Sequence, residues 1–187
     1  MPAVASGPNW NRLFETAAAQ EGYFTTAQAA ESGYSLPLLA KYLHNGRVVR
    51  TRRGVYRSVH FPAGEHEDMV TVWLWSDRVG VFSHETALLL HGLSDVLPAR
   101  VLLTLPAAWA KRRFRVPEGV VLHHGDIADG ERSWVGSVPL TSPRRTLLDV
   151  RHASVSPELV EQATRQAIAR GLIGKKDAAR LASEGTQ

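Results

Sequence analysis

The sequence contains no cysteine, which excludes a disulfide framework and any zinc site built on thiolates. No apolar run approaches the roughly 20 residues needed to span a bilayer, so we expect no membrane partner. Residues 1–11 lack a basic segment followed by an apolar one, which predicts a cytoplasmic protein without a signal peptide. The chain also lacks a nucleophile elbow, a P-loop and a dinucleotide fingerprint, and we therefore expect no enzyme activity, no cofactor and no metal.

The most informative absence is local, because residues 32–64 contain no Asp or Glu. We call this segment the basic stretch. Its six basic side chains are Lys41, Arg47, Arg50, Arg52, Arg53 and Arg57. The chain has 22 Lys and Arg against 18 Asp and Glu, and outside the basic stretch 16 basic residues face those same 18 acidic ones. The whole positive excess therefore lies in one segment, as is typical of a surface that binds DNA or RNA.

The elements around the basic stretch predict a winged helix. Helices are expected at residues 10–20, 27–31 and 36–45. The second and third are joined by a short turn at Gly33, which is the pattern of a helix-turn-helix. Two β-prone runs around a turn at 52–54 follow, and they predict a hairpin with basic residues at its tip.

The rest of the chain predicts a mixed α/β domain. Strands are expected at 79–82, 101–105 and 120–124, and helices at 65–77, 85–91, 143–150, 157–170 and 175–183. A Pro- and Gly-containing linker at 61–64 separates this region from the basic hairpin. The predicted fold class is α/β (α+β), with a winged helix-turn-helix in residues 1–60 and an α/β domain in residues 65–187.

The third helix is the predicted reading helix, with Leu36, Leu39 and Leu43 facing inward and polar groups facing DNA. The hairpin then supplies phosphate contacts or enters the minor groove. The predicted DNA-binding residues are Ser35, Lys41, Tyr42, Asn45, Arg47, Arg50, Arg52, Arg53 and Arg57. Neutralising about four to six phosphates per protomer predicts a salt slope of about −4 to −5.

Three motifs follow one another along the chain: RRGVYR at 52–57, SHETALLLHGLSD at 83–95 and VPLTSPRRTLLD at 138–149. In this order they resemble the AbiEi family of type IV toxin–antitoxin systems, including the related mycobacterial MenA antitoxins. The resemblance covers roughly Tyr23 to the C-terminus. It implies a winged helix-turn-helix followed by an α/β domain that neutralises a toxin.

The resemblance also implies partners. Members of this family repress their own operon by binding inverted repeats of double-stranded DNA in the promoter. They counteract a nucleotidyltransferase-like toxin encoded beside them. We therefore expect an antitoxin and autorepressor with these two partners.

A second basic run consists of Lys111, Arg112, Arg113 and Arg115, with Phe114 inside it. It fits a further DNA contact, a surface for an acidic toxin or a solvated loop. Arg145 near a predicted helix start fits either an anion site or a pair with Asp149 at i+4.

The histidines have competing interpretations as well. His84 and His91 lie seven residues apart on one predicted helix, which fits either a metal site or structural histidines, but they lack the i, i+4 spacing of a zinc protease. His123 and His124, with Asp126 nearby, are adjacent on a predicted strand and should point to opposite faces. Structural histidines are the simpler interpretation of His84 and His91, and placement in a loop or an edge strand is the simpler interpretation of His123 and His124.

Two rival functions fit the sequence. One is a DNA-binding regulator without a toxin partner, whose second domain dimerises or senses a ligand. The other is a nucleic-acid-processing enzyme with a metal site that the motifs do not show.

Overall fold

A computed structural model describes residues 7–93, 95, 97–113, 115–153 and 155–184. Its chain forms two compact units, Met1–Arg78 and Val79–Gln187. Each unit combines helices with a sheet, which confirms the predicted α/β class. Among the described residues, no helix is both long and apolar enough to cross a membrane.

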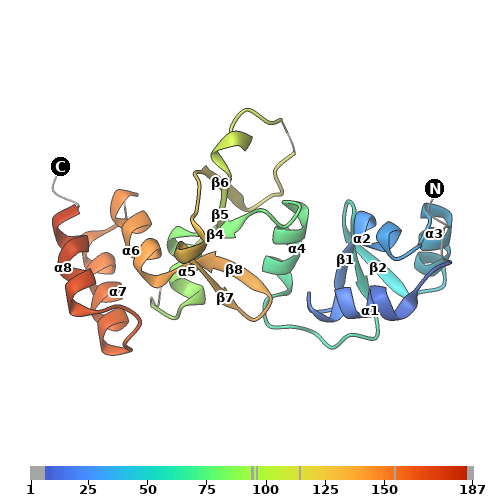
Figure 1. Cartoon of the computed structure of the whole chain (residues 1–187), viewed down its shortest axis with the longest axis horizontal. Helices are drawn as coiled ribbons and strands as arrows, with labels where there is room; N and C mark the ends of the chain where they lie inside the picture. The colour runs from blue at the N-terminus through green and yellow to red at the C-terminus, as the bar shows by residue number, and fades with distance from the viewer. Residues whose placement is uncertain (1–6, 94, 96, 114, 154, 185–187) are drawn as a thin grey trace. The chain divides into compact units, whose positions relative to one another are not determined.

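The N-terminal unit contains four helices and one three-stranded sheet among its described residues (Figure 1). The helices are α1 (Trp10–Ala18), α2 (Thr26–Glu31), α3 (Leu36–His44) and α4 (Glu67–Trp75), and the strands are β1 (Tyr23–Thr25), β2 (Val48–Arg52) and β3 (Val55–Ser58). The sheet has the order β1-β3-β2, and both pairs of neighbours are antiparallel. A helix-turn-helix of α2 and α3 followed by the β2–β3 hairpin is a winged-helix arrangement.

Local sequence signals set the ends of these helices. Thr25 forms a capping box with Gln28 at the start of α2. The Ser35 hydroxyl accepts a hydrogen bond from Leu38 N at 3.4 Å at the start of α3. Gly33 has φ +81° between the two helices, a backbone conformation that favours glycine. The predicted turn at Gly33 is therefore confirmed.

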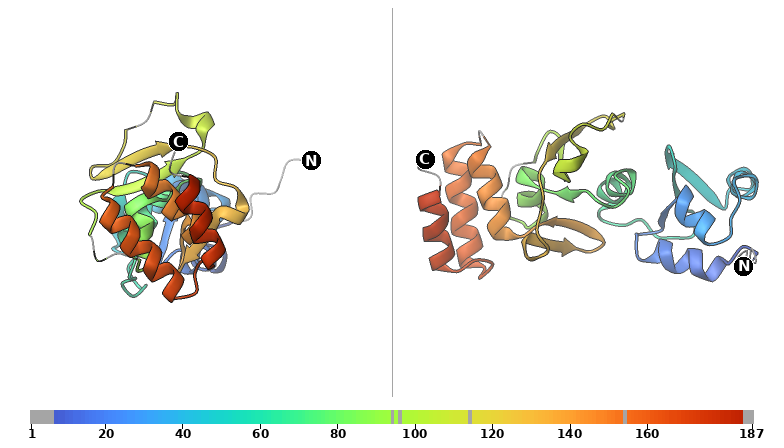
Figure 2. Two further views of the ribbon diagram at one scale, coloured as in Figure 1. Left: turned by 90° about the vertical axis from the view of Figure 1, so that its left-hand side faces the viewer. Right: turned by 45° about the horizontal axis from the view of Figure 1, so that its top comes forward.

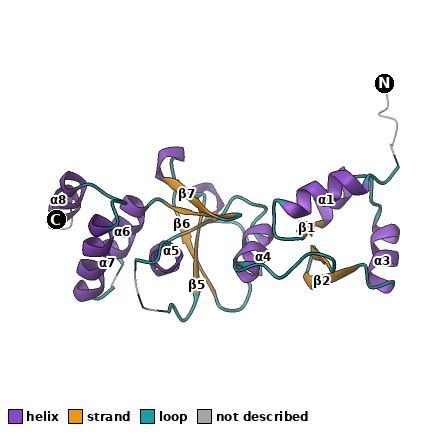
Figure 3. Ribbon diagram, turned by 90° about the horizontal axis from the view of Figure 1, so that it is seen from below, coloured by secondary structure: helices purple, strands orange, loops and turns teal. Residues whose placement is uncertain are grey.

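One face of the sheet packs on α1, α2 and α3. The core cluster on this side includes Phe24 and Tyr56, whose rings stack at 5.8 Å, with Leu13, Leu39 and Val48 around them. Figure 3 shows α1 and α3 beside β1 and β2. This packing holds α3 against β2 and fixes the position of the hairpin relative to the reading helix.

The helix α4 packs with the N-terminal unit, on the sheet. Thr71 accepts a hydrogen bond from Arg52 of β2 at 3.1 Å, and Glu67 pairs with Arg57 of β3 at 3.1 Å. The predicted domain boundary at residues 60–65 lies before α4, whereas the compact unit ends at Arg78. The difference arises because these contacts join α4 to the hairpin across the linker.

The C-terminal unit is built on a five-stranded mixed sheet of order β6-β5-β4-β8-β7. The strands are β4 (Val81–Phe82), β5 (Val101–Leu105), β6 (Val120–His124), β7 (Arg132–Val135) and β8 (Val138–Thr141). The helices α5 (His84–Leu90) and α6 (Pro143–His152) pack on this sheet, and α7 (Pro157–Ala169) and α8 (Lys175–Glu184) pack on α6. Figure 2 shows the three C-terminal helices, coloured orange to red, side by side. The core between α5 and these three helices includes Leu88, Leu147 and Leu181, which are at most 1% exposed.

Candidate nucleic-acid interface

The outer face of α3 is exposed. Its exposed residues are Leu36, Pro37, Ala40, Lys41 and His44, with Ser35 and Asn45 at the two caps. Leu39 is buried and Leu43 packs against the core, as predicted. The prediction for Leu36 was wrong, because this side chain is 66% exposed. Leu38 and Tyr42 pack against the core in its place, so the inward stripe is rotated around the helix axis.

Tyr42 and Arg47 form a stacked pair at the C-terminal end of α3. The Arg47 guanidinium lies over the Tyr42 ring at 5.2 Å, and that ring meets Tyr34 edge-on at 5.6 Å. Burial, followed by the neighbouring Tyr42, raises the pKa of Tyr34. Tyr42, which the sequence fits as a DNA contact or as a packing residue, therefore packs between Tyr34 and Arg47. The Arg47 side chain itself remains exposed.

Two grooves meet at this pair. One has a volume of about 260 Å³ and is lined by Leu38, Lys41, Tyr42, Asn45 and Arg47. The other, of about 460 Å³, is lined by Trp10, Tyr42, Arg47 and His60. The structure thus brings together the predicted contacts Lys41, Asn45 and Arg47. It adds Trp10 and His60, which were not predicted because they lie outside the reading helix and the hairpin.

The hairpin places two more cations at the surface. Arg50 lies opposite Tyr56 in the register of β2 and β3, so it is on the sheet face that packs against α1–α3. Arg53 occupies the two-residue turn with Gly54, whose φ is +77°. The turn is held by Thr26 N, which donates to Gly54 O at 2.9 Å. The predicted basic tip is therefore present. It is a two-residue turn that this backbone hydrogen bond attaches to the start of α2.

Arg52 and Arg57, two of the predicted DNA contacts, have partners inside the unit. Arg52 is half-buried and donates to Thr71. Arg57 is half-buried, pairs with Glu67 and donates to Phe61 O at 2.9 Å. Both lie on the sheet side covered by α4, and burial, then Glu67, raises the pKa of the neighbouring Tyr23 to about 12. We therefore treat Arg52 and Arg57 as structural residues.

Four cations remain as the candidate interface: Lys41, Arg47, Arg50 and Arg53. All four are exposed, and none forms an ion pair with the described residues. No acidic residue occurs in the basic stretch to neutralise them. These four residues, which we call the cationic set, give the surface its positive charge.

Comparison with known proteins identifies this region. Residues 11–59, which contain α1 apart from Trp10, α2, α3 and the hairpin, match the family model described as "Transcriptional regulator, AbiEi antitoxin". This segment is similar to the AbiEi family of antitoxins. The match covers the cationic set and every residue named as lining the two grooves except Trp10 and His60. No curated protein matches the chain.

A solved structure is similar to this chain along its whole length. It is the crystal structure of the RV2827C protein from Mycobacterium tuberculosis, at 18% sequence identity and a TM-score of 0.47. The similarity covers 100% of this chain and 81% of that one. At this level of identity and structural agreement, it identifies no function for this chain.

His84 and His91, which lie outside residues 11–59, have hydrogen-bond partners inside the C-terminal unit. His84 stacks on His123 at 3.9 Å and hydrogen-bonds the Ser83 hydroxyl at 2.8 Å. His91 Nε2 lies 2.7 Å from Thr141 O, so this nitrogen donates. His84 and His91 therefore do not converge, and no group of three metal-ligating side chains occurs among the described residues. The hydrogen-bond partners of His84 and His91 support the structural interpretation of both.

Burial makes both histidines sensitive to acid. The pKa of His84 is lowered by burial and then by His123, and burial lowers the pKa of His91. Both folded-state values lie below the unfolded value of about 6.5, so the unfolded chain binds more protons in this window. The stability that the neutral rings contribute is complete above pH 6.5 and is lost as the pH falls below it.

We therefore expect the melting temperature of the C-terminal unit to fall between pH 7.5 and pH 5. A double variant, His84→Asn with His91→Gln, should show a weaker fall over the same range. Thermal unfolding followed by circular dichroism at several pH values measures both. An equal pH dependence in the variant and the parent would contradict this assignment.

Arg145 does not form an open anion site. Its Nε donates to Asp149 Oδ1 at 2.7 Å, and its Nη1 donates to Glu131 Oε2 at 2.8 Å. Two carboxylates thus neutralise the guanidinium, which confirms the predicted i+4 pair with Asp149. The network joins the start of α6 to the turn before β7.

The second basic run remains exposed on the loop between β5 and β6. Lys111, Arg112, Arg113 and Arg115 are all exposed, and Arg112 lies over the Trp109 ring at 4.0 Å. Phe114 falls outside the described residues. The run keeps its three interpretations as a DNA contact, a toxin surface or a solvated loop.

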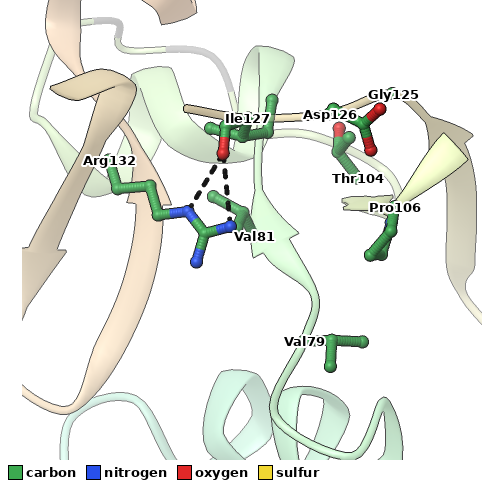
Figure 4. Close-up of a pocket in the computed structure, with 8 residues that line it drawn as sticks. All are labelled: Val79, Val81, Thr104, Pro106, Gly125, Asp126, Ile127 and Arg132. Atoms are coloured by element: carbon green, nitrogen blue, oxygen red, sulfur yellow. Dashed lines mark hydrogen bonds between the residues drawn. The ribbon is translucent and has the colours of Figure 1, made fainter. Parts of the chain in front are cut away.

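A small pocket opens at one end of the C-terminal sheet (Figure 4). Arg132 donates two hydrogen bonds to Ile127 O, and Asp126 accepts one from Ala107 N at 3.1 Å. The pocket volume is about 80 Å³. Sites for organic ligands usually occupy about 300–1,000 Å³, so this pocket does not support a ligand-sensing domain.

Proposed function

We propose that this protein is an AbiEi-type antitoxin and a transcriptional autorepressor. The observation that carries the proposal is the cationic set around an exposed α3 face, inside a segment similar to the AbiEi family. In this proposal α3 enters the major groove of the promoter, and the hairpin contacts the phosphates beside it.

The electrostatics support duplex DNA as the ligand. Four exposed cations without local carboxylates would each displace about one counterion from a phosphate. The expected salt slope is then about −4, at the lower end of the range that the sequence predicts. Arg47 also stacks on Tyr42, and this contact restricts the directions that its guanidinium can take.

The antitoxin role is assigned to the C-terminal unit. That unit would bind or otherwise counteract a nucleotidyltransferase-like toxin. Its exposed basic run at 111–115 is the surface that we assign to an acidic toxin partner. The family match covers residues 11–59 only, and this favours one rival, a DNA-binding regulator without a toxin.

A promoter-binding experiment tests the regulatory half. The full chain is mixed with the duplex upstream of its own reading frame and with a scrambled duplex of equal length, in an electrophoretic shift assay. The proposal predicts at least about tenfold tighter binding to the upstream duplex. Equal binding to both duplexes would refute sequence-specific repression.

Co-expression tests the antitoxin half. If a nucleotidyltransferase-like protein is encoded beside this chain, its toxicity should be relieved by the full chain. It should not be relieved by a variant with alanine at 111–113 and 115. If neither the full chain nor this variant relieves the toxicity, the rival function of a DNA-binding regulator without a toxin is favoured.

A further inference from the structure

The exposed face of α3 has an apolar patch at its N-terminal end. Leu36 is 66% exposed, and Pro37 and Ala40 are exposed beside it. Leu36 and Ala40 are four residues apart, so their side chains are neighbours on the helix surface. The Leu36 side chain lies outside the core at the start of the reading helix, so it is available to contact a partner of that helix. We call these three residues the apolar patch of α3.

The cations around the apolar patch indicate which class of partner it contacts. Lys41 is on the same exposed face, and Arg47 shares a groove with Lys41. Arg50 lies on the sheet face that packs against α1–α3. Apolar side chains with cations around them match a DNA major groove, where phosphates flank the edges of the bases. An apolar protein surface would leave the same cations without partners.

In the major groove, the base feature that apolar side chains contact is the C5 methyl group of thymine. The residues that reach base edges lie toward the N-terminus of a reading helix, which is where the apolar patch is. We propose that Leu36 and Ala40 recognise thymine methyl groups and so determine part of the sequence preference. This inference rests on the proposed DNA-binding function and specifies what the reading helix reads.

Replacing thymine by deoxyuridine removes the methyl group and leaves base pairing intact. A duplex is first selected by the full chain from a pool with 20 randomised base pairs, a length of about two helical turns. Each thymine of the selected duplex is then replaced by deoxyuridine, one at a time. Burying one methyl group stabilises a contact enough to change affinity about 3- to 5-fold. At least one position should therefore lose about 3- to 5-fold in affinity.

The variant Leu36→Ala tests which side chain is responsible. It should bind the parent duplex about 3- to 5-fold more weakly than the unmodified chain, and deoxyuridine at the sensitive position should then have almost no further effect. Leu97→Ala is the matched control, since Leu97 is 78% exposed in the C-terminal unit. This control should keep the full sensitivity to deoxyuridine.

The outcomes separate this inference from the function on which it rests. If no sequence is enriched from the random pool, sequence-specific DNA binding itself is refuted. If a duplex is enriched but no thymine is sensitive, only the methyl recognition is refuted. Undiminished sensitivity in Leu36→Ala, or unchanged affinity of that variant, would also overturn the role of Leu36.

Discussion

Replacing Arg50 and Arg53 together with alanine is expected to weaken binding to specific and random duplexes alike, by roughly 30- to 100-fold at low salt. Both side chains are exposed on the hairpin and have no carboxylate partner among the described residues. Each phosphate contact contributes about 0.9 to the salt slope, so the slope should become flatter by about 2. Titration of labelled duplexes by fluorescence anisotropy, at several salt concentrations, measures both quantities.

The control for this prediction removes two charges elsewhere. Lys175 and Lys176 are exposed at the start of α8, and their replacement by alanine changes the net charge by the same amount. That variant should keep the affinity and the slope of the parent. An equal loss in both variants would show that net charge, rather than the hairpin, drives binding.

The substitution Leu147→Ala is expected to lower the stability of the C-terminal unit by a large amount. Leu147 is fully buried in the cluster that joins α5, α6, α7 and α8. Truncating a buried leucine to alanine usually costs about 2–5 kcal/mol, because transfer energy is lost and a cavity remains. We expect about 3 kcal/mol here, and a melting temperature of this unit that is lower by more than 10 °C.

DNA affinity separates the two units in this experiment. Below the melting temperature of the variant, Leu147→Ala should bind DNA like the parent, because the cationic set lies entirely in the N-terminal unit. It should lose antitoxin activity at growth temperature. Leu172→Ala is the control, since Leu172 is 39% exposed in the same unit. A parallel loss of DNA binding would contradict the assignment of the two functions to two units.

Local signals in the sequence predicted most of the winged helix. Ser35 and Gly46 mark the ends of α3, which was expected at 36–45 and spans Leu36–His44. The turn expected at 52–54 lies between β2 and β3. Capping and turn chemistry depend on a few neighbouring residues, so one sequence contains this information.

Side-chain direction depended on partners that the sequence does not reveal. Leucine spacing placed Leu36 inside, but Tyr42 packs on Tyr34 and rotates the buried stripe away from Leu36. Arg57 was expected to face DNA, but its register with Val49 points it to the side where α4 supplies Glu67. These outcomes are decided by tertiary packing rather than by local propensity.

Short strands were the main omission in the predicted fold. No strand was predicted at Tyr23–Thr25, yet this segment pairs with Val55–Arg57 as a strand. Arg132–Val135 was not predicted at all, and it becomes β7 by pairing with β8. Three or four residues carry too weak a periodic signal, and their strand character comes from the partner.

The most direct test of the account is the salt dependence of binding between the full chain and the duplex upstream of its own gene. Affinity is measured from about 50 to 200 mM salt, where an electrostatic interface shows its largest change. The cationic set predicts a logarithmic slope of about −4, together with tighter binding than to a scrambled duplex. A slope near zero, or no binding at 50 mM salt, would contradict the assignment of this surface to DNA.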